Sequence, residues 1–267
     1  MGVFRFKKFE VINERSAMKV NTDGVLLGAA MTILPSDRSL LDIGTGTGTI
    51  ALMAAQRLTD RSSIGVGDDV PEASCVCQID AIDIDEPSAS EAAANFTNSP
   101  WAEMLHAHNR SLEEFASDLN SAAPISDALD RRFGNKFDLI FSNPPYFEDS
   151  LTAPDERKST ARHTSDGLSY RDIFGFAKEH LSPTGRVSLV LPADQETALC
   201  RYARMSGFHL FRMLRIRTVP RKAPSRMIAE FSRIRTDAPE ETILTIQNEG
   251  QYTDEYLSLT KDFYLFA

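Results

Sequence analysis

The chain of 267 residues contains only three cysteines and lacks any apolar run of about 18 residues, the length that a membrane-spanning helix needs. Three cysteines are too few for a disulfide framework, which favours a reducing compartment, and we expect a cytoplasmic protein that does not enter a membrane. The basic start, residues 1–8, is not followed by an apolar segment, so the sequence predicts no secretory signal.

Basic side chains are fewer than acidic ones, and the formal net charge of −9 counts against a nucleic-acid partner. The charge is strongly segregated, however. Residues 60–118 hold 13 acidic and two basic side chains, whereas residues 201–235 hold ten basic side chains and one acidic one, Glu230. Because an electrostatic field depends on local patches, the second stretch still allows binding of a polyanion.

Apolar residues make up 42% of the chain and charged residues 25%, which is typical of a globular protein with a sizeable core. No internal repeat or Gly/Ser-rich linker divides the chain. We therefore expect one domain over residues 36–267, preceded by an N-terminal segment, residues 1–35.

Short apolar strands alternate with helical segments in the middle of the chain. The patterns predict strands over residues 39–44, 78–85, 104–108, 137–142 and 185–191, and helices over residues 49–58, 87–97 and 170–180. This order is typical of an α/β fold in which helices cover both faces of a mostly parallel sheet. Two polar stretches, near residues 59–77 and 117–135, interrupt the pattern and are expected to be insertions.

A glycine-rich motif, Asp42-Ile-Gly44-Thr-Gly46-Thr-Gly48, follows the first of these strands. Glycines let the backbone turn tightly and approach a ligand, and the next helix begins with N–H groups that have no partner in the helix. A dinucleotide fingerprint has its third glycine one position later, and the carboxylate of Asp42 suits a cationic ligand. The pattern resembles the first motif of S-adenosylmethionine-dependent methyltransferases, which makes Asp42, Gly44 and Gly46 candidate cofactor residues.

The second strand ends in Asp83-Ile-Asp85. An acid at the carboxyl end of this strand in such a unit accepts hydrogen bonds from both ribose hydroxyls. Asp83 is the preferred candidate because it lies nearer the sheet than Asp85, for which a solvated strand end is an equally good interpretation.

The fourth strand is followed at once by Asn143-Pro144-Pro145-Tyr146. The prolines fix the backbone and have no N–H to donate, so carbonyl groups are left to face a ligand. The Asn143 side-chain oxygen and the Pro144 carbonyl then accept both hydrogens of a planar amino group, while the ring of Tyr146 stacks on a base. Asn143, Pro144 and Tyr146 are therefore the candidate catalytic residues.

Taken together, these residues resemble the bacterial family that N6-methylates the adenine beside the anticodon of a valine tRNA. The segments that carry this resemblance, besides the two motifs above, are residues 17–29, 98–103 and 263–266. It implies a Rossmann-like class I methyltransferase with a seven-stranded sheet, S-adenosylmethionine as donor and tRNA as acceptor. A glutamine amide in a protein and guanine N2 in ribosomal RNA remain alternative acceptors, and a cofactor-binding RNA chaperone without catalysis is a further alternative.

The resemblance also places the N-terminal segment over the methionine end of the cofactor, with Thr22 and Asp23 near its ammonium or carboxylate. Asp23 has an ordinary interpretation too, as the N-cap of a helix. The family tends to carry an acid after the third strand, beside the cofactor adenine. This chain has Ser111 at the matching position, and either its hydroxyl or the Asn109 amide is the expected substitute.

The basic stretch near residues 212–235 predicts a hairpin at the edge of the sheet that contacts phosphates. Its candidate RNA-binding residues are Arg212, Arg215, Arg217, Arg221, Lys222 and Arg226. The alternative, an ordinary solvated face, predicts interspersed acids, and the stretch contains only Glu230. We expect no stable protein partner.

Cys75 and Cys77, with His106 and His108, form pairs two residues apart on predicted strands. Strand alternation produces such pairs, and zinc sites usually have wider spacing. We therefore expect no metal.

Overall fold

The computed structural model describes residues 2–62, 77–121, 135–145 and 167–267. Most of both predicted insertions and the candidate catalytic residue Tyr146 lie outside these residues, as does Cys75. The helices are α1 (Thr22–Ala30), α2 (Thr49–Ser62), α3 (Glu86–Thr97), α4 (Leu112–Asn120), α5 (Tyr170–His180), α6 (Glu196–Met205) and α7 (Asp254–Thr260). None of these helices is long and apolar enough to cross a membrane.

The main sheet consists of β3 (Ser39–Ile43), β4 (Gln78–Asp83), β5 (Leu105–Asn109), β6 (Phe137–Ser142), β7 (Leu181–Pro192), β8 (His209–Arg217), β9 (Arg226–Ser232) and β10 (Glu240–Thr245). The strand order is β10-β8-β9-β7-β6-β3-β4-β5, and every pair is parallel except those that include β9. The predicted mostly parallel α/β sheet is confirmed, but it has eight strands and not seven. The additional strand is β10, which pairs with β8 at the edge.

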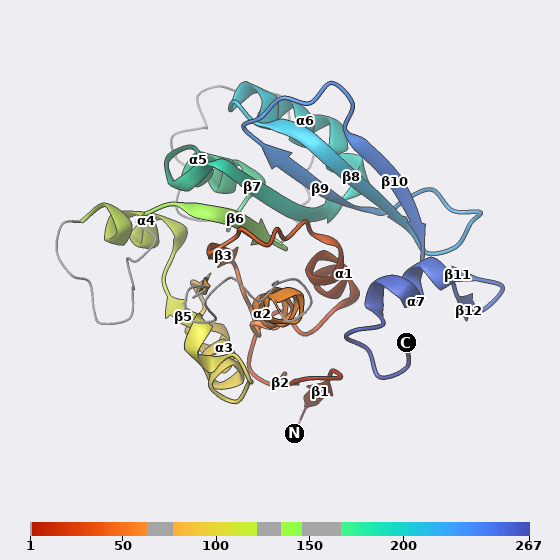
Figure 1. Ribbon diagram of the computed structural model, residues 1–267, viewed down its shortest axis with the longest axis horizontal. Helices are drawn as coiled ribbons and strands as arrows, with labels where there is room; N and C mark the ends of the chain where they lie inside the picture. The colour runs from red at the N-terminus through yellow and green to blue at the C-terminus, as the bar shows by residue number, and fades with distance from the viewer. Residues whose placement is uncertain (1, 63–76, 122–134, 146–166) are drawn as a thin grey trace, which may run out of the picture.

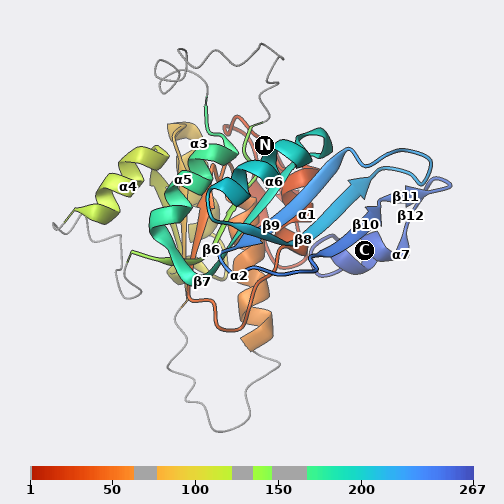
Figure 2. The same cartoon turned by 90° about the horizontal axis from the view of Figure 1, so that it is seen from above.

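Helices cover both faces of the sheet, as predicted (Figure 1), and the face that α5 and α6 cover is turned toward the viewer in Figure 2. One hydrophobic cluster joins α1, α2, α3 and α7 to one face, and a second cluster joins α4, α5 and α6 to the other. Adjacent residues of β3 alternate between the two, since Leu40 belongs to the first cluster and Leu41 to the second. Because both faces are covered, all five residues of β3 are buried, which accounts for Leu40, Leu41 and Ile43 without an alternation of apolar and exposed polar residues.

The basic hairpin consists of β8 and β9, which are antiparallel neighbours. It does not form the edge of the sheet as predicted, because β10 covers one side of it and β7 the other. Since β8 runs parallel to β7 and β6, the turn between β8 and β9, residues 218–225, lies at the same edge of the sheet as the carboxyl end of β6.

The two ends of the described chain lie close together, below the sheet in Figure 1. The short strands β1 (Val3–Arg5) and β2 (Glu10–Ile12) form a hairpin, and so do β11 (Gln247–Asn248) and β12 (Gln251–Tyr252). The Phe6 ring stacks on Tyr264 with centroids 6.0 Å apart, and the Lys7 N–H donates to the Phe263 carbonyl at 2.8 Å. This contact tethers the N-terminal segment to the C-terminal residues.

Candidate active site

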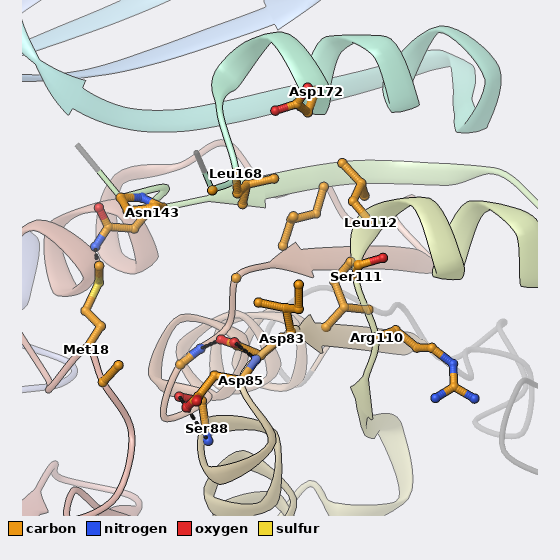
Figure 3. A pocket seen from close by; sticks show the side chains of 18 of the residues that line it. Met18, Asp83, Asp85, Ser88, Arg110, Ser111, Leu112, Asn143, Leu168 and Asp172 are labelled. Carbon is orange, nitrogen blue, oxygen red and sulfur yellow. Dashed lines mark hydrogen bonds between the residues drawn. The ribbon is translucent and has the colours of Figure 1, made fainter. Parts of the chain in front are cut away.

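A cavity of about 570 Å³ lies where β3, β4 and β6 end (Figure 3). The strand order reverses between β3 and β6, and ligands of open α/β sheets bind at such a point. Its lining includes Met18, Gly44, Gly46, Asp83, Ser111 and Asn143, together with Asp85, Ser88, Arg110, Leu112, Pro145, Leu168 and Asp172. Candidate residues from four distant parts of the sequence, near residues 44–46, 83, 111 and 143, thus meet in one place.

The glycine-rich loop joins β3 to α2 with all three of its glycines at positive φ, namely 71° at Gly44, 57° at Gly46 and 79° at Gly48. Residues other than glycine rarely adopt this backbone conformation, which explains why glycine recurs in the loop. Gly48 has a second reason: a Cβ there would lie 2.4 Å from the Phe96 ring on α3. The close packing of the loop on α3 therefore depends on its glycines.

Asp42 does not line the cavity. Its carboxylate is fully buried beneath the loop and accepts a hydrogen bond from the Thr45 hydroxyl at 2.7 Å. Burial raises the pKa of Asp42 to about 7, the nearby charge of Asp83 adds to this, and the Thr45 hydrogen bond opposes it. Asp42 therefore stabilises the loop through its hydrogen bond with Thr45.

Asp83 lies at the end of β4 with both carboxylate oxygens fixed by backbone groups. One oxygen accepts the Gly46 N–H at 2.8 Å and the other accepts the Asp85 N–H at 2.9 Å. Burial raises the pKa of Asp83, while these two hydrogen bonds lower it. Each oxygen has a second lone pair for a ligand, so Asp83 both orders the loop and offers acceptors to the cavity.

Asp85 is not a solvated strand end. It is the N-cap of α3, accepting the Ser88 N–H at 3.0 Å and the Ser88 hydroxyl at 2.7 Å. Both residues line the cavity. A sequence signal for this exists, since an acid followed by Pro87 at the start of a helix is typical capping chemistry.

Ser111 lines the cavity as the N-cap of α4. Its hydroxyl accepts the Glu114 N–H at 3.1 Å, and the Glu114 carboxylate accepts the Ser111 N–H at 2.9 Å. The Asn109 amide donates to the carbonyls of Asp83 and Ile84, at 3.1 Å each, and thereby holds the end of β4. Of the two residues expected to replace the acid, Ser111 is the one that reaches the cavity.

Asn143 lies at the carboxyl end of β6 and is only 5% exposed. Its Nδ2 donates to the Met18 sulfur at 3.4 Å, and Figure 3 shows the nitrogen turned toward Met18 and the amide oxygen on the other side. The strand end is fixed because the preceding Ser142 hydroxyl donates to the Ile43 carbonyl at 2.6 Å. Pro144 is buried, whereas Pro145 is exposed and lines the cavity.

Thr22 and Asp23, the candidate cofactor residues in the N-terminal segment, do not line the cavity. Asn21 is the N-cap of α1, with its side chain accepting the Gly24 N–H at 2.8 Å, so the alternative interpretation of Asp23 as the cap is wrong. Asp23 forms an ion pair with Arg226 at 2.8 Å. The N-terminal segment instead contributes Ala17 and Met18, which sequence reasoning missed.

Leu168 and Asp172 were missed as well, and both line the cavity beside the start of α5. The Asp172 carboxylate accepts hydrogen bonds from the Ser169 N–H at 3.0 Å and the Ser169 hydroxyl at 2.7 Å. The pattern Ser-x-x-Asp before an amphipathic segment is a recognisable helix start. It does not reveal, however, that this helix begins at the cavity.

Most of the candidate RNA-binding arginines are engaged within the protein. Arg212 is bonded to the buried carboxylate of Glu230 at 2.7 Å, and Arg215 contacts Glu196 at 2.6 Å and Glu241 at 2.8 Å. The pKa of Arg215 is raised, first by the hydrogen bond with Glu196 and then by that with Glu241. The acids that the alternative interpretation required are present: Glu230 lies in the stretch itself, and Glu196 and Glu241 come from outside it.

Arg217 donates to the Thr245 hydroxyl at 2.8 Å and to the Pro220 carbonyl at 3.0 Å. Arg221 and Lys222, in the turn between β8 and β9, are exposed, and within the described residues the structure gives neither an ion pair. Of the six candidate RNA-binding residues, these two are therefore the exposed cations that have no carboxylate partner within the described residues.

Among the described residues, no group of three or more His, Cys, Asp or Glu side chains is placed to hold a metal ion. His108 is paired with Asp80 at 2.8 Å, and the Cys77 thiol donates to the Asp37 carbonyl at 3.3 Å.

Curated relatives match the chain over nearly its whole length. A tRNA1(Val) (adenine(37)-N6)-methyltransferase of Bacteroides fragilis is 38% identical over 262 residues, covering 98% of this chain and 97% of the relative. The protein of the same name from Photobacterium profundum is 37% identical, covering 98% of each. The chain belongs to the tRNA1(Val) (adenine(37)-N6)-methyltransferase family. The resemblance predicted from the motifs is thus confirmed.

Solved structures agree with this family at the level of the fold. A predicted O-methyltransferase from Agrobacterium tumefaciens superposes with a TM-score of 0.57 at 14% identity, covering 90% of this chain and 96% of its own. A putative class I S-adenosylmethionine-dependent methyltransferase from Listeria monocytogenes gives a TM-score of 0.50, covering 94% of this chain and 70% of its own. No protein-family model matches the chain.

Proposed function

We propose that this protein transfers a methyl group from S-adenosylmethionine to the exocyclic N6 of an adenine in tRNA, namely the anticodon-loop adenine of a valine tRNA. The observation that carries the proposal is the buried Asn143, which ends β6 at the cavity where the strand order reverses. The activity named for the relatives of the family supports the choice of acceptor. Since tRNA is a cytoplasmic substrate, we expect the protein in the cytoplasm.

The cavity residues fit S-adenosylmethionine. A volume of about 570 Å³ lies within the range of roughly 300–1,000 Å³ that is usual for ligand pockets. The fixed carboxylate of Asp83 suits a ribose diol, and the apolar side chains of Leu112 and Leu168 suit the faces of an adenine. Ser111 offers a hydroxyl to that base. When bound there, the cofactor supplies an electrophilic methyl group on its sulfonium.

Asn143 and Pro144 would hold the acceptor. The amide oxygen of Asn143 and the carbonyl of Pro144 accept the two hydrogens of a planar amino group, which directs the nitrogen lone pair out of the ring plane and toward the methyl group. Met18 takes the Nδ2 hydrogen of Asn143 and so defines which end of the amide is the acceptor. Positioning and polarisation of this kind supply most of the rate effect in such a transfer. Tyr146 stays a proposed stacking residue.

We also propose that RNA approaches along the edge of the sheet that holds this cavity. The turn with Arg221 and Lys222 lies at that edge, three strands from β6, which is about 14 Å at the usual strand spacing. An aromatic pair adjoins the turn, because the Thr218 carbonyl accepts the Gln247 N–H at 2.9 Å and Gln247 pairs with Tyr252. Tyr252 and Phe266 are 40% and 56% exposed, with ring centroids 5.2 Å apart.

Exposed rings beside cations suit the unpaired bases and phosphates of an RNA loop. Arg212, Arg215 and Arg226 are left out of this surface because carboxylates already neutralise them.

The experiment that tests the function compares the wild-type protein with Asn143→Ala, using tRNA from a strain that lacks the modification and labelled S-adenosylmethionine. We expect label in tRNA with the wild type and a loss of at least about a hundredfold in turnover with the variant, the scale of removing one aimed hydrogen-bonding group. Calorimetry should show cofactor binding within a few-fold of the wild type. Wild-type-like turnover by Asn143→Ala would refute the assigned role, and label only in protein would refute the acceptor.

A further inference from the structure

Glu91 is a buried carboxylate that faces backbone N–H groups and no cation. It lies in α3 and is 1% exposed. It accepts the N–H groups of Glu14 at 2.9 Å, Arg15 at 2.7 Å and Ser16 at 3.2 Å. Within the described residues, no lysine or arginine pairs with it. Burying an unpaired charge is costly, so three charge-assisted hydrogen bonds to consecutive residues mark a strongly fixed point of the chain.

The same face of α3 holds this segment at two further points. The Ser88 hydroxyl, one turn before Glu91, contacts the Ser16 hydroxyl with an oxygen–oxygen distance of 3.0 Å. Asn95, one turn after Glu91, accepts the Ile12 N–H at 2.8 Å and donates to the Ile12 carbonyl at 3.0 Å. We call residues 12–18 the strap. Side chains of α3 that are spaced one turn apart hold the strap along one side of the helix.

The fastened strap leads directly into the candidate active site. The Ser16 hydroxyl donates to the Met18 carbonyl at 3.0 Å, and a Cβ on Gly46 would lie 3.5 Å from each of these two oxygens. The strap thus packs against the glycine-rich loop. Its last two residues, Ala17 and Met18, line the cavity, and the Met18 sulfur accepts the Asn143 Nδ2 hydrogen. Figure 3 shows Met18 reaching from the strap toward Asn143.

We infer that Glu91 is a positioning residue for the reaction. It touches neither the cavity nor Asn143, but it fixes the strap whose end forms one wall of the cofactor cavity and sets the orientation of the Asn143 amide. This inference rests on the proposed function for its catalytic consequence, and on the geometry alone for its effect on cofactor binding. The glutamine that would replace Glu91 has one acceptor oxygen and an NH₂ group, so it cannot accept all three N–H groups.

The test compares Glu91→Gln with Glu86→Gln, the same change on the same helix at an exposed position. We expect Glu91→Gln to bind S-adenosylmethionine about tenfold more weakly by calorimetry and to lower kcat, with faster hydrogen exchange at residues 14–18. Glu86→Gln should match the wild type in all three. Affinity and exchange within twofold of the wild type in a folded Glu91→Gln protein would overturn the inference.

A double-mutant cycle separates positioning from simple destabilisation. If Glu91 acts through the strap, adding Glu91→Gln to Met18→Ala changes kcat and KM much less than adding it to the wild type. Fully additive effects, with loss of stability as the only other change, would contradict the inference. Should Glu91→Gln fail to fold, Ser16→Ala removes the contacts of the Ser16 hydroxyl with Ser88 and the Met18 carbonyl and leaves the three N–H groups in place. It should then show a smaller change of the same kind, and wild-type affinity would overturn the inference.

These outcomes remain distinct from failure of the proposed function. If the wild-type protein binds S-adenosylmethionine but does not methylate tRNA, the function fails, while the affinity and exchange measurements still decide the role of Glu91.

Discussion

Replacing Arg212 by methionine tests whether this arginine stabilises the fold or binds RNA. The guanidinium donates to the Glu230 carboxylate and to the Ala30 carbonyl, at 2.7 Å each, and Glu230 is fully buried. Methionine retains much of the apolar stem but, among the described residues, leaves Glu230 with the two hydrogen bonds from Thr32. Breaking a buried pair in this way usually costs about 3–5 kcal/mol.

The lower end of that range applies here, because the Arg212 side chain is 19% exposed and Thr32 still stabilises the carboxylate. We therefore expect a loss of about 3 kcal/mol in the free energy of unfolding, which lowers Tm by about 6–12 °C for a chain of this size. Denaturant unfolding measures the first quantity and thermal unfolding the second. At a temperature where the variant is folded, its tRNA affinity and the dependence of that affinity on salt should equal those of the wild type.

Unchanged stability together with weaker, less salt-dependent tRNA binding would refute this reasoning and restore Arg212 as a phosphate contact.

Three further predictions follow from the same structure. Replacing both Arg221 and Lys222 by glutamine should weaken tRNA binding and lower the slope of log affinity against log salt by roughly 0.7–0.9 per lost phosphate contact, without loss of stability. The matched control is Arg235→Gln, which changes an exposed arginine beyond the opposite end of β9. A slope equal to that of the control would contradict the proposed RNA surface. Asp83→Asn removes the charge and one of the two oxygens that accept the N–H groups of Gly46 and Asp85. Calorimetry should show S-adenosylmethionine binding weakened by about 10–100-fold, at about 1.4 kcal/mol per tenfold. Unchanged affinity would exclude Asp83 from the cofactor site. Burial raises the pKa of Asp42 from 3.8 to about 7, so the native state binds an extra proton between these values and the stability of the wild type falls as pH rises through them. The free energy of unfolding of Asp42→Asn, measured in urea, should therefore rise by about 2–4 kcal/mol relative to that of the wild type between pH 4 and pH 8. A difference that does not depend on pH would contradict the raised pKa.

The fold was largely predictable because its parallel strands are buried on both faces. That burial produces short apolar runs, such as residues 39–43 and 137–142, separated by amphipathic helices. β10 was missed for the complementary reason. It is an edge strand with its first four residues exposed, so Glu240–Ile243 has no apolar pattern. Its pairing with β8 is a tertiary contact that local sequence does not specify.

The site was predictable where backbone geometry fixes the residue type. Gly44 and Gly46 have positive φ, Asp83 is the last residue of β4 and Asn143 directly follows β6, so a motif indicates each of them. Met18 and Leu168 were not predictable, because an apolar side chain at a cavity has the same sequence signal as one in the core. Asp42 is the opposite case. The glycine-rich motif makes it a candidate cofactor residue, but its carboxylate is buried beneath the loop and does not line the cavity.

The basic stretch shows the limit of reading charge from a single segment. Its arginines have few acids nearby in sequence, but Glu196 and Glu241 neutralise Arg215, and Asp23 neutralises Arg226 from 203 positions away. Local charge density therefore overstates the positive surface. Two exposed cations at the edge of the sheet that holds the cavity remain, and they carry the proposal of RNA binding.

The most direct test of the central claim uses two transcripts of a valine tRNA that differ only in the adenine beside the anticodon, which is intact in one and replaced by guanine in the other. After incubation with the protein and labelled S-adenosylmethionine, each transcript is digested to nucleosides. We expect label in N6-methyladenosine from the intact transcript and none from the substituted one. Equal labelling of both transcripts, or label in N2-methylguanosine, would contradict it.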